Sequence, residues 1–289
     1  MIDILLEPFG YQYMVRAMMA SALIGAVCAF LSCYLIMKGW SLMGDALAHA
    51  VVPGVAVAYL LALPYALGAF VAGILAALGM AFVRRKSKLR EDAVIGIVFT
   101  AFFALGLALI SMNPVSVNIY AVMLGSILAV SDYDLLQIVF ISFFSIIVLI
   151  LKWKDLMLVF FDENHARAVG LPVGGMKILF FVVLSAAIVA ALQAVGAVLV
   201  IALVITPGAT AYLLTNRFGV MIILAILISV LSCISGVYLS YFLDGSTGGV
   251  IVVLQTMLFL LAFVFAPSHG MIAARRAVRR DMSRHGGAA

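Results

Sequence analysis

Two ionisable residues, Asp45 and His49, lie four positions apart inside an apolar stretch that runs from Trp40 to Val55. In a helix this spacing puts both side chains on one face, with their Cα atoms about 6 Å apart. A carboxylate oxygen and an imidazole nitrogen placed in this way can bind one divalent cation. An Asp at membrane depth costs roughly 2.5–3.5 kcal/mol and therefore needs a function. The pair predicts a site for a transported or gating metal ion.

Each of these residues alone has a simpler interpretation. Asp45 follows Gly44 and could cap a helix, while His49 could donate to a neighbouring carbonyl. The sequence Pro53-Gly54 favours the metal site, because proline has no N–H and leaves the carbonyl of His49 without its helical partner. Interrupted transmembrane helices often build ion sites at such points. We therefore expect a hinge at Pro53 and Gly54, with the freed His49 carbonyl as a candidate third ligand.

The composition is that of a polytopic helical membrane protein. Hydrophobic residues make up 67% of the 289 residues, charged residues make up 10%, and the mean hydropathy is +1.30, which excludes an ordinary soluble fold. Residues 1–289 are expected to form a single transmembrane domain without a cleaved signal peptide. An odd number of cysteines in apolar stretches argues against disulfides and thiolate metal sites. These cysteines are Cys28, Cys33 and Cys233.

The apolar runs predict eight or nine membrane spans, depending on whether 177–214 crosses once or twice. The stretch 113–131 is expected to be a loop with a short helix that need not cross, and the tail 268–289 is expected to be cytoplasmic and disordered. The runs cover residues 14–37, 41–63, 65–83, 93–112, 133–151, 177–193, 195–214, 219–243 and 250–267.

Basic residues predict the orientation of the chain. They gather at 84–90, at 152–177 and at 275–284. All three groups are cytoplasmic if the N-terminus is outside and the chain crosses nine times. The loops left outside then carry acidic residues and, apart from Arg16, no basic residue, which would raise the local concentration of cations. These acids are Asp3, Glu7, Asp132, Asp134 and Asp244.

The cytoplasmic segment 152–176 contains the signals of a short helix. Asp162 and Glu163 place acids at its positive end, and Gly170 followed by Pro172 terminates it. A short, firmly terminated helix in a cytoplasmic loop is typical of a docking element. His165 in this helix is expected to be solvated and not a ligand.

No energy-converting motif is present in the sequence. It lacks a G-x-x-x-x-G-K-[ST] phosphate loop and an H-E-x-x-H helix, so a pump driven by ATP must use the ATPase of another chain. A proton-coupled metal carrier is one alternative, although it should show more buried titratable groups or inverted repeats. An intramembrane metalloenzyme is another, with Gln193, Thr206 and Asp244 as weak candidates for the further ligand and base that it would need.

Residues 38–54, Lys-Gly-Trp-Ser-Leu-Met-Gly-Asp-Ala-Leu-Ala-His-Ala-Val-Val-Pro-Gly, closely resemble the signature of permease subunits from ATP-binding cassette importers of manganese, zinc and iron. The sequence of residues 33–40 is most similar to the manganese/iron branch of the family, and the zinc branch is the alternative. The resemblance covers roughly residues 12–267. Further similar motifs lie at 92–97, 162–171, 193–208 and 240–249.

The resemblance implies an all-helical permease fold like that of vitamin B12 and iron-chelate importers, in the bacterial inner membrane. It implies that Asp45 and His49 coordinate the metal along the translocation path. It also implies two permease subunits, either two copies or two related chains, with two cytoplasmic ATPases and an extracytoplasmic metal-binding protein. The segment 162–171, including Asp162, Glu163, Ala166 and Gly170, would dock on the ATPase. The chain departs from the family at Ala48, where Ser is more frequent, and this change should slightly dry the site.

The predicted cargo follows from the ligand types. One carboxylate and one imidazole form a mixed donor set that suits Mn²⁺, Fe²⁺ or Zn²⁺, with no permanently bound cofactor expected. A second candidate hinge is Pro207-Gly208, where proline removes the bond to the Leu203 carbonyl and Thr206 and Thr210 can bond neighbouring carbonyls. The alternative at Pro207 is a kink packed against its neighbours.

Overall fold

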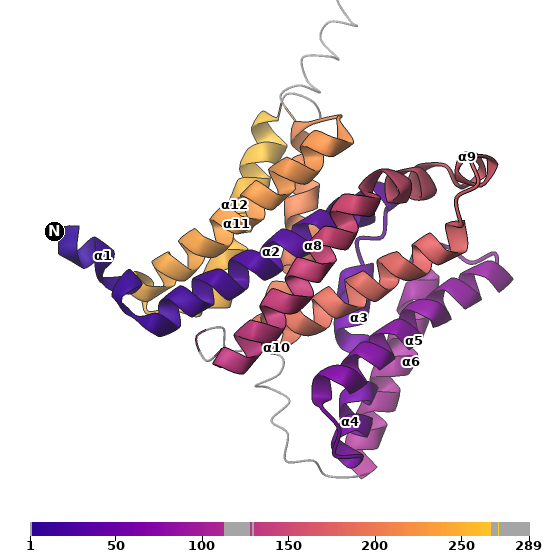
Figure 1. Cartoon of the computed structure of the whole chain (residues 1–289), viewed down its shortest axis with the longest axis horizontal. Helices are drawn as coiled ribbons and strands as arrows, with labels where there is room; N and C mark the ends of the chain where they lie inside the picture. The colour runs from indigo at the N-terminus through magenta and orange to yellow at the C-terminus, as the bar shows by residue number, and fades with distance from the viewer. Residues whose placement is uncertain (1, 113–127, 129, 267–270, 272–289) are drawn as a thin grey trace, which may run out of the picture.

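A computed structural model describes residues 2–112, 128, 130–266 and 271. Those residues form helices joined by short turns, and no strand occurs among them. The expectations for most of 113–131 and for the tail 268–289 fall outside the described residues. The helices are α1 (Ile2–Gly10), α2 (Gln12–Lys38), α3 (Met43–Ala50), α4 (Val52–Leu60), α5 (Tyr65–Lys86), α6 (Glu91–Met112), α8 (Asp132–Phe161), α9 (Glu163–Ala168), α10 (Val173–Leu214), α11 (Phe218–Leu243) and α12 (Thr247–Phe265) (Figure 1).

Eight helical stretches of the described chain are long and apolar enough to cross a membrane, with α3 and α4 counted together as one. The helix α10 reverses direction at Gly196, where φ is 77° and ψ is 165°. On one side of this residue Phe180 packs its ring 5.7 Å from Tyr34 of α2, and on the other side the Gly208 N–H donates to Ser32 of the same helix. A straight helix would separate positions 180 and 208 by about 42 Å. The arms 173–195 and 197–214 therefore each cross, as the division of 177–214 into two spans predicts.

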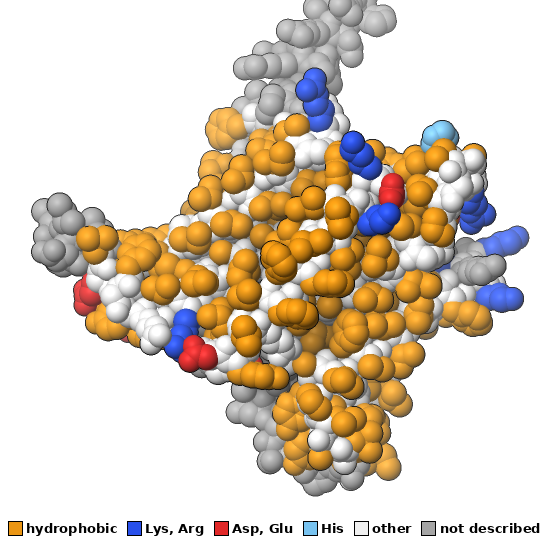
Figure 2. All heavy atoms as spheres, viewed as in Figure 1, with side chains coloured by type: hydrophobic (Ala, Val, Ile, Leu, Met, Phe, Trp, Pro, Cys, Tyr) orange, Lys and Arg blue, Asp and Glu red, His pale blue; other side chains and the backbone are white. Residues whose placement is uncertain are grey.

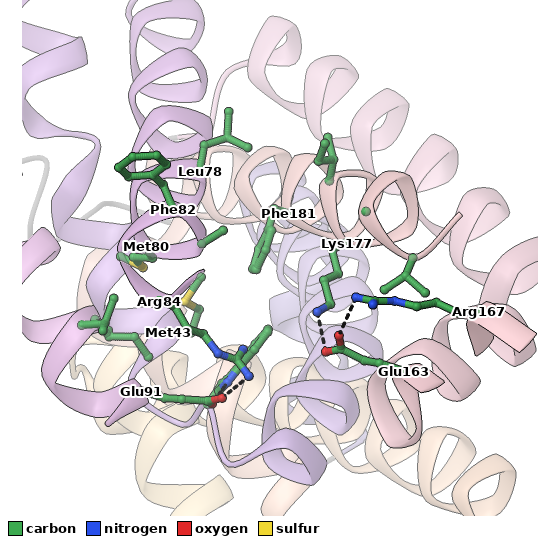
Figure 3. Close-up of a pocket in the computed structure, with 17 residues that line it drawn as sticks. Met43, Leu78, Met80, Phe82, Arg84, Glu91, Glu163, Arg167, Lys177 and Phe181 are labelled. Carbon is green, nitrogen blue, oxygen red and sulfur yellow. Dashed lines mark hydrogen bonds and ion pairs between the residues drawn. The ribbon is translucent and has the colours of Figure 1, made fainter. Parts of the chain in front are cut away.

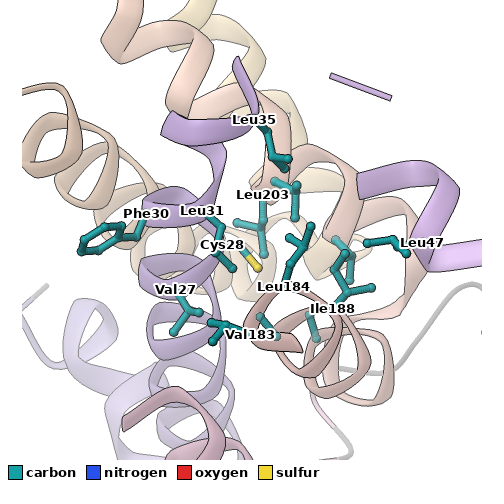
Figure 4. Packing of buried hydrophobic residues seen from close by; sticks show 14 of the residues in the cluster. Val27, Cys28, Phe30, Leu31, Leu35, Leu47, Val183, Leu184, Ile188 and Leu203 are labelled. Carbon is teal, nitrogen blue, oxygen red and sulfur yellow. The ribbon is translucent and has the colours of Figure 1, made fainter. Parts of the chain in front are cut away.

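The core lies where α2 and both arms of α10 meet, with α11 and α12 on one side and α3 to α6 on the other (Figure 1). Leucines on these helices interdigitate around the buried Cys28, and Leu47 of α3 points toward Leu184 of α10 (Figure 4). All three cysteines are free and buried, as expected. Lipid tails are as apolar as these side chains, so burying apolar side chains does not by itself drive helices together in a membrane. Small residues favour helix contacts there because they let the helices approach closely.

The described basic residues that were expected in the cytoplasm lie mostly at one end of the bundle (Figure 2). Lys38 at the end of α2 donates to the Phe160 carbonyl at 3.1 Å, and Lys177 at the start of α10 pairs with Glu163 of α9. Most of the basic side chains in view lie toward the end that carries α9, and a broad hydrophobic surface separates them from the other end (Figure 2). The positive-inside rule predicts that this end faces the cytoplasm.

The opposite end is held by different polar contacts. Arg16 near the start of α2 pairs with Asp132 at the start of α8, with nitrogen and oxygen 2.7 Å apart. Gln137 of α8 donates to Gln193 at the end of the first α10 arm, at 3.2 Å. Nine crossings then place the start of α2 and the end of α12 at opposite ends of the bundle, and which end faces the cytoplasm stays a prediction.

Candidate metal site and coupling helix

Asp45 and His49 lie on the same face of α3, as their spacing predicts. The His49 Nε2 and Asp45 Oδ1 atoms are 3.3 Å apart, and the two side chains are 21% and 38% exposed respectively. The opposite face of α3 is fully buried at Leu47, which packs into the main hydrophobic cluster. The helix therefore presents one carboxylate and one imidazole on a face that other molecules can reach. Their role as metal ligands stays a prediction.

The helix that carries this pair is interrupted, but earlier than the proline. α3 ends at Ala50 and α4 begins at Val52, so the break falls at Val51. Pro53 occupies the first turn of α4, where its missing N–H leaves no bond unmade. The N–H of Val51 points back toward the carbonyl of His49. Pro53 supplies no N–H to this carbonyl, and the role of the carbonyl as a third ligand stays a prediction.

The break is clamped between neighbouring helices. A Cβ added at Gly54 would lie 2.0 Å from the Gly68 carbonyl oxygen of α5, and one added at Gly106 of α6 would lie 2.7 Å from Val52. The glycine at position 54 thus allows α4 and α5 to touch backbone to backbone. Movement at Pro53 and Gly54 stays a prediction, and these contacts imply that any such movement must carry α5 and α6 with it.

The kink at Pro207 is packed against α2. Ser32 donates its hydroxyl to the Ile205 carbonyl at 3.2 Å and accepts the Gly208 N–H at 3.1 Å. Thr210 bonds back to the Thr206 carbonyl at 2.8 Å, as predicted. These contacts are those of the second interpretation, a kink packed against its neighbours, and a hinge at this position stays a prediction.

Two aromatic rings beside the metal pair were not predicted. Phe99 and Phe103 of α6 lie with their ring centroids 5.7 Å and 5.5 Å from the imidazole of His49. Their spacing of four residues puts them on one face of α6, but that span is apolar all round and its sequence does not show which face meets α3. The rings restrict how the imidazole of His49 can turn.

The other polar candidates lie elsewhere. Gln193 is bonded to Gln137, Thr206 accepts through its carbonyl from Thr210, and Asp244 is exposed at the end of α11. Within the described chain no group of three or more His, Cys, Asp or Glu side chains could hold a metal. The structure therefore gives an intramembrane metalloenzyme none of the three as a further ligand beside Asp45.

The short helix predicted in the cytoplasmic segment is present as α9. Its N-cap is Asp162, whose carboxylate accepts the N–H groups of Asn164 and His165, both at 3.0 Å. The helix is closed by Gly170, which adopts a left-handed φ of 85° that glycine tolerates. Ala166 is fully buried and fixes the inner face of α9, whereas His165 is exposed, as expected.

Glu163 ties α9 to the start of α10. Partial burial raises the pKa of its carboxyl, but a hydrogen bond and the charge of Lys177 outweigh this effect, together with the charges of Lys38 and Arg84. The net pKa of Glu163 lies below its ordinary value of 4.5, so the group is ionised at neutral pH. Arg167 is a further partner, 3.9 Å from the same carboxylate.

A cavity of about 730 Å³ opens beside α9 and was also not predicted. Its walls come from α3, α5, α6, α9 and α10, and two charged groups face each other across it: Arg84 with Glu91 on one side, and Glu163 with Lys177 and Arg167 on the other (Figure 3). The cavity thus lies between α9 and the beginning of α3, the helix that carries Asp45.

The chain matches the family described as the ABC 3 transport family over residues 10–266. It belongs to this family. The chelated iron transport system membrane protein YfeC of Yersinia pestis is 59% identical over 279 residues, which are 96% of this chain and 95% of that protein. The manganese transport system membrane protein MntB of Synechocystis is 49% identical over 93% of this chain and 88% of that protein.

Solved structures agree with this assignment of the ABC 3 family. PsaBC from Streptococcus pneumoniae, solved in complex with a Fab, has a TM-score of 0.82 and 34% identity, over 93% of this chain and 98% of that chain. An inward-facing metal-chelate type ABC transporter has a TM-score of 0.59 at 17% identity and shares the fold. The chain is therefore a multi-pass permease of the metal-ion ABC importer family, as its motifs predict, and relatives named for iron and manganese transport agree with the predicted branch.

Proposed function

We propose that this chain is the membrane-spanning subunit of an ATP-driven importer of divalent transition metals, with Mn²⁺ or Fe²⁺ as cargo. The observation that carries the proposal is the Asp45–His49 pair on the accessible face of an interrupted helix. Carboxylate oxygen and imidazole nitrogen together suit Mn²⁺, Fe²⁺ and Zn²⁺, and suit Ca²⁺ or Cu⁺ poorly. Relatives named for chelated iron and manganese transport support the same choice of cargo.

The site in one chain is incomplete, which fits transport. Two side chains alone bind a divalent ion weakly, and a second permease subunit would supply a second pair across the path. An ion held by four such ligands from two subunits could bind briefly and leave again, because neither subunit encloses it. The second subunit is either another copy of this chain or a related one.

The driving force must come from a separate protein. The sequence contains no phosphate-binding loop, and α9 offers a firmly capped helix at the cytoplasmic end for an ATPase to grip. ATP binding and hydrolysis would move this helix and switch the accessibility of the path. A metal-binding protein outside the membrane would deliver the ion.

The test of this function is metal uptake in cells with and without the gene, measured separately for Mn²⁺, Fe²⁺ and Zn²⁺. Asp45→Asn and His49→Ala should each abolish uptake at equal protein levels. Asp155→Asn is a matched control, since Asp155 makes only a surface ion pair with Lys152. Normal uptake by either of the first two variants would refute the metal site.

The same assay separates the alternatives. If cells without the gene lose Zn²⁺ uptake but keep Mn²⁺ and Fe²⁺ uptake, the chain belongs to a zinc importer of the same family. A proton-coupled carrier would be favoured if uptake continues after the partner ATPase is inactivated and depends on the proton gradient.

A further inference from the structure

Trp40 lies in the turn between α2 and α3, five residues before Asp45, and is only 5% exposed. Its backbone joins the two helices, because its N–H donates to the Leu35 carbonyl at 2.8 Å and its carbonyl accepts the Met43 N–H at 3.0 Å. A displacement of this residue therefore displaces the start of the helix that carries the metal pair.

The indole ring of Trp40 is held on one side by the two helices that flank α9. Phe160 of α8 meets it edge-on, with ring centroids 5.5 Å apart, and Phe181 of α10 stacks on it at 5.8 Å. Phe160 lies two residues before Asp162, the N-cap of α9. Phe181 lies one turn after Lys177, which pairs with Glu163 of α9. The helix α9 packs against α8 and α10, so both of its attachments lead to Trp40.

On its other side the ring is held by α5 and α6. The indole N–H donates to the carboxylate of Glu91, which also pairs with Arg84, and the Arg84 guanidinium lies 5.5 Å from the ring centroid. A buried indole N–H needs an acceptor, and a charged acceptor makes the stronger bond. The cation over the ring adds a further attraction. Four helices thus fix one side chain from two directions.

The cavity beside the Trp40 ring separates the charged side chains of α9 from those of α5 and α6. Glu163 and Arg167 of α9 face Arg84 and Glu91 across it without an ion pair between the two sides (Figure 3). The aromatic rings therefore form a close-packed connection from α9 toward α3, and the cavity beside them is open space. Close-packed side chains transmit displacement because they cannot be compressed.

We propose that Trp40 is a positioning residue that transmits movement of α9 to α3, and so to Asp45 and His49. The inference rests on the proposed function, since it requires that an ATPase moves α9. It adds a specific element to that function: the indole of Trp40, set between Phe160 and Phe181 on one side and Glu91 on the other, couples ATP hydrolysis to metal movement.

The test uses the complete transporter, purified with its ATPase, reconstituted into liposomes and supplied with Mn²⁺ as the probe. We expect Trp40→Leu to keep ATP hydrolysis and Mn²⁺ binding but to lower the Mn²⁺ imported per ATP by about tenfold, a normal size for coupling between sites. Trp40→Phe keeps a ring against Phe160 and Phe181 and should restore part of this ratio. Trp153→Leu is the control, because the other tryptophan of the chain lies outside this cluster.

A second readout leaves Trp40 in place. In a Trp153→Phe background Trp40 is the only tryptophan of the permease, and its emission should change when a non-hydrolysable ATP analogue binds the ATPase. A transporter with both tryptophans replaced by Phe supplies the background from the partner chains.

The outcomes separate the two proposals. An unchanged Mn²⁺-to-ATP ratio in Trp40→Leu, or an emission that does not respond to the analogue, would overturn the role of Trp40. A wild-type complex that hydrolyses ATP and imports no Mn²⁺ would contradict the proposed function instead, and the emission measurement would still decide whether Trp40 follows the ATPase. If Trp40→Leu does not assemble, the emission measurement decides alone.

Discussion

Replacing Gly54 by Ala tests the packing of α4, the helix that follows the Asp45–His49 pair, against α5. The added Cβ would lie 2.0 Å from the Gly68 carbonyl oxygen and 2.6 Å from the Ala72 Cβ, and the first of these is a backbone atom that cannot turn aside. Weak carbon–oxygen contacts normally lie at about 3.3–3.6 Å, so α4 and α5 must separate by more than about 1 Å. Overpacking of this kind costs about 1–3 kcal/mol or more.

Gly96→Ala on α6 is the matched control for this variant. A Cβ added there meets nothing within 4 Å, so the change should stabilise the helix by roughly 0.8–1.0 kcal/mol through propensity alone. The two Gly→Ala variants are therefore expected to shift the melting temperature of the detergent-purified permease in opposite directions. Uptake should fall with Gly54→Ala and remain normal with Gly96→Ala. Equal melting temperatures for the two variants would refute the tight contact between α4 and α5.

Three further predictions concern the cytoplasmic helix and the topology. Ala166→Pro should break α9 past its first turn and uncouple ATP hydrolysis from uptake; wild-type co-purification of the ATPase together with intact uptake would contradict this. Lys177 lowers the pKa of Glu163, so the wild type should be more stable than Glu163→Gln by a constant amount above pH 4.5. This advantage should be lost as the pH falls through the lowered pKa of Glu163, and melting curves at several pH values will show the loss. In a background without the native cysteines, a cysteine at Asp244 should react with an impermeant thiol reagent from outside and one at Lys88 only after the membrane is opened; the reverse pattern would overturn the orientation.

The features that sequence reasoning predicted correctly depend on local chemistry. Asp162 and Gly170 are a cap and a stop that act within one turn, so they set the bounds of α9 whatever surrounds it. The spacing of Asp45 and His49 likewise fixes their common face without any tertiary information. A break beside them was expected from Pro53-Gly54, but it falls earlier, at Val51, and the proline is accommodated in the first turn of the next helix.

The features that escaped prediction depend on which helix meets which. Phe99, Phe103 and Trp40 sit in apolar sequence where every face is compatible with lipid, so no polar side marks the exposed surface. The contact of Gly54 with Gly68 joins two of the 24 glycines of the chain: Gly54 was expected to form a hinge with Pro53, but nothing in the sequence near Gly68 marks it as the partner of Gly54. In a membrane, pairing between helices is set by shape, which sequence periodicity does not encode.

The reversal at Gly196 lets both arms of α10 contact the start of α3. Because α10 folds back, its first arm brings Phe181 against Trp40 before α3, and its second arm brings Val204 within 2.6 Å of a Cβ added at Gly44, next to Asp45. The start of α3 is therefore held by both arms at once. A rearrangement that alters access to Asp45 must shift at least one of these arms. The first arm begins directly after α9, so in the proposed mechanism a displacement of α9 would pass through the first arm of α10 and Trp40 to Asp45 and His49 on α3.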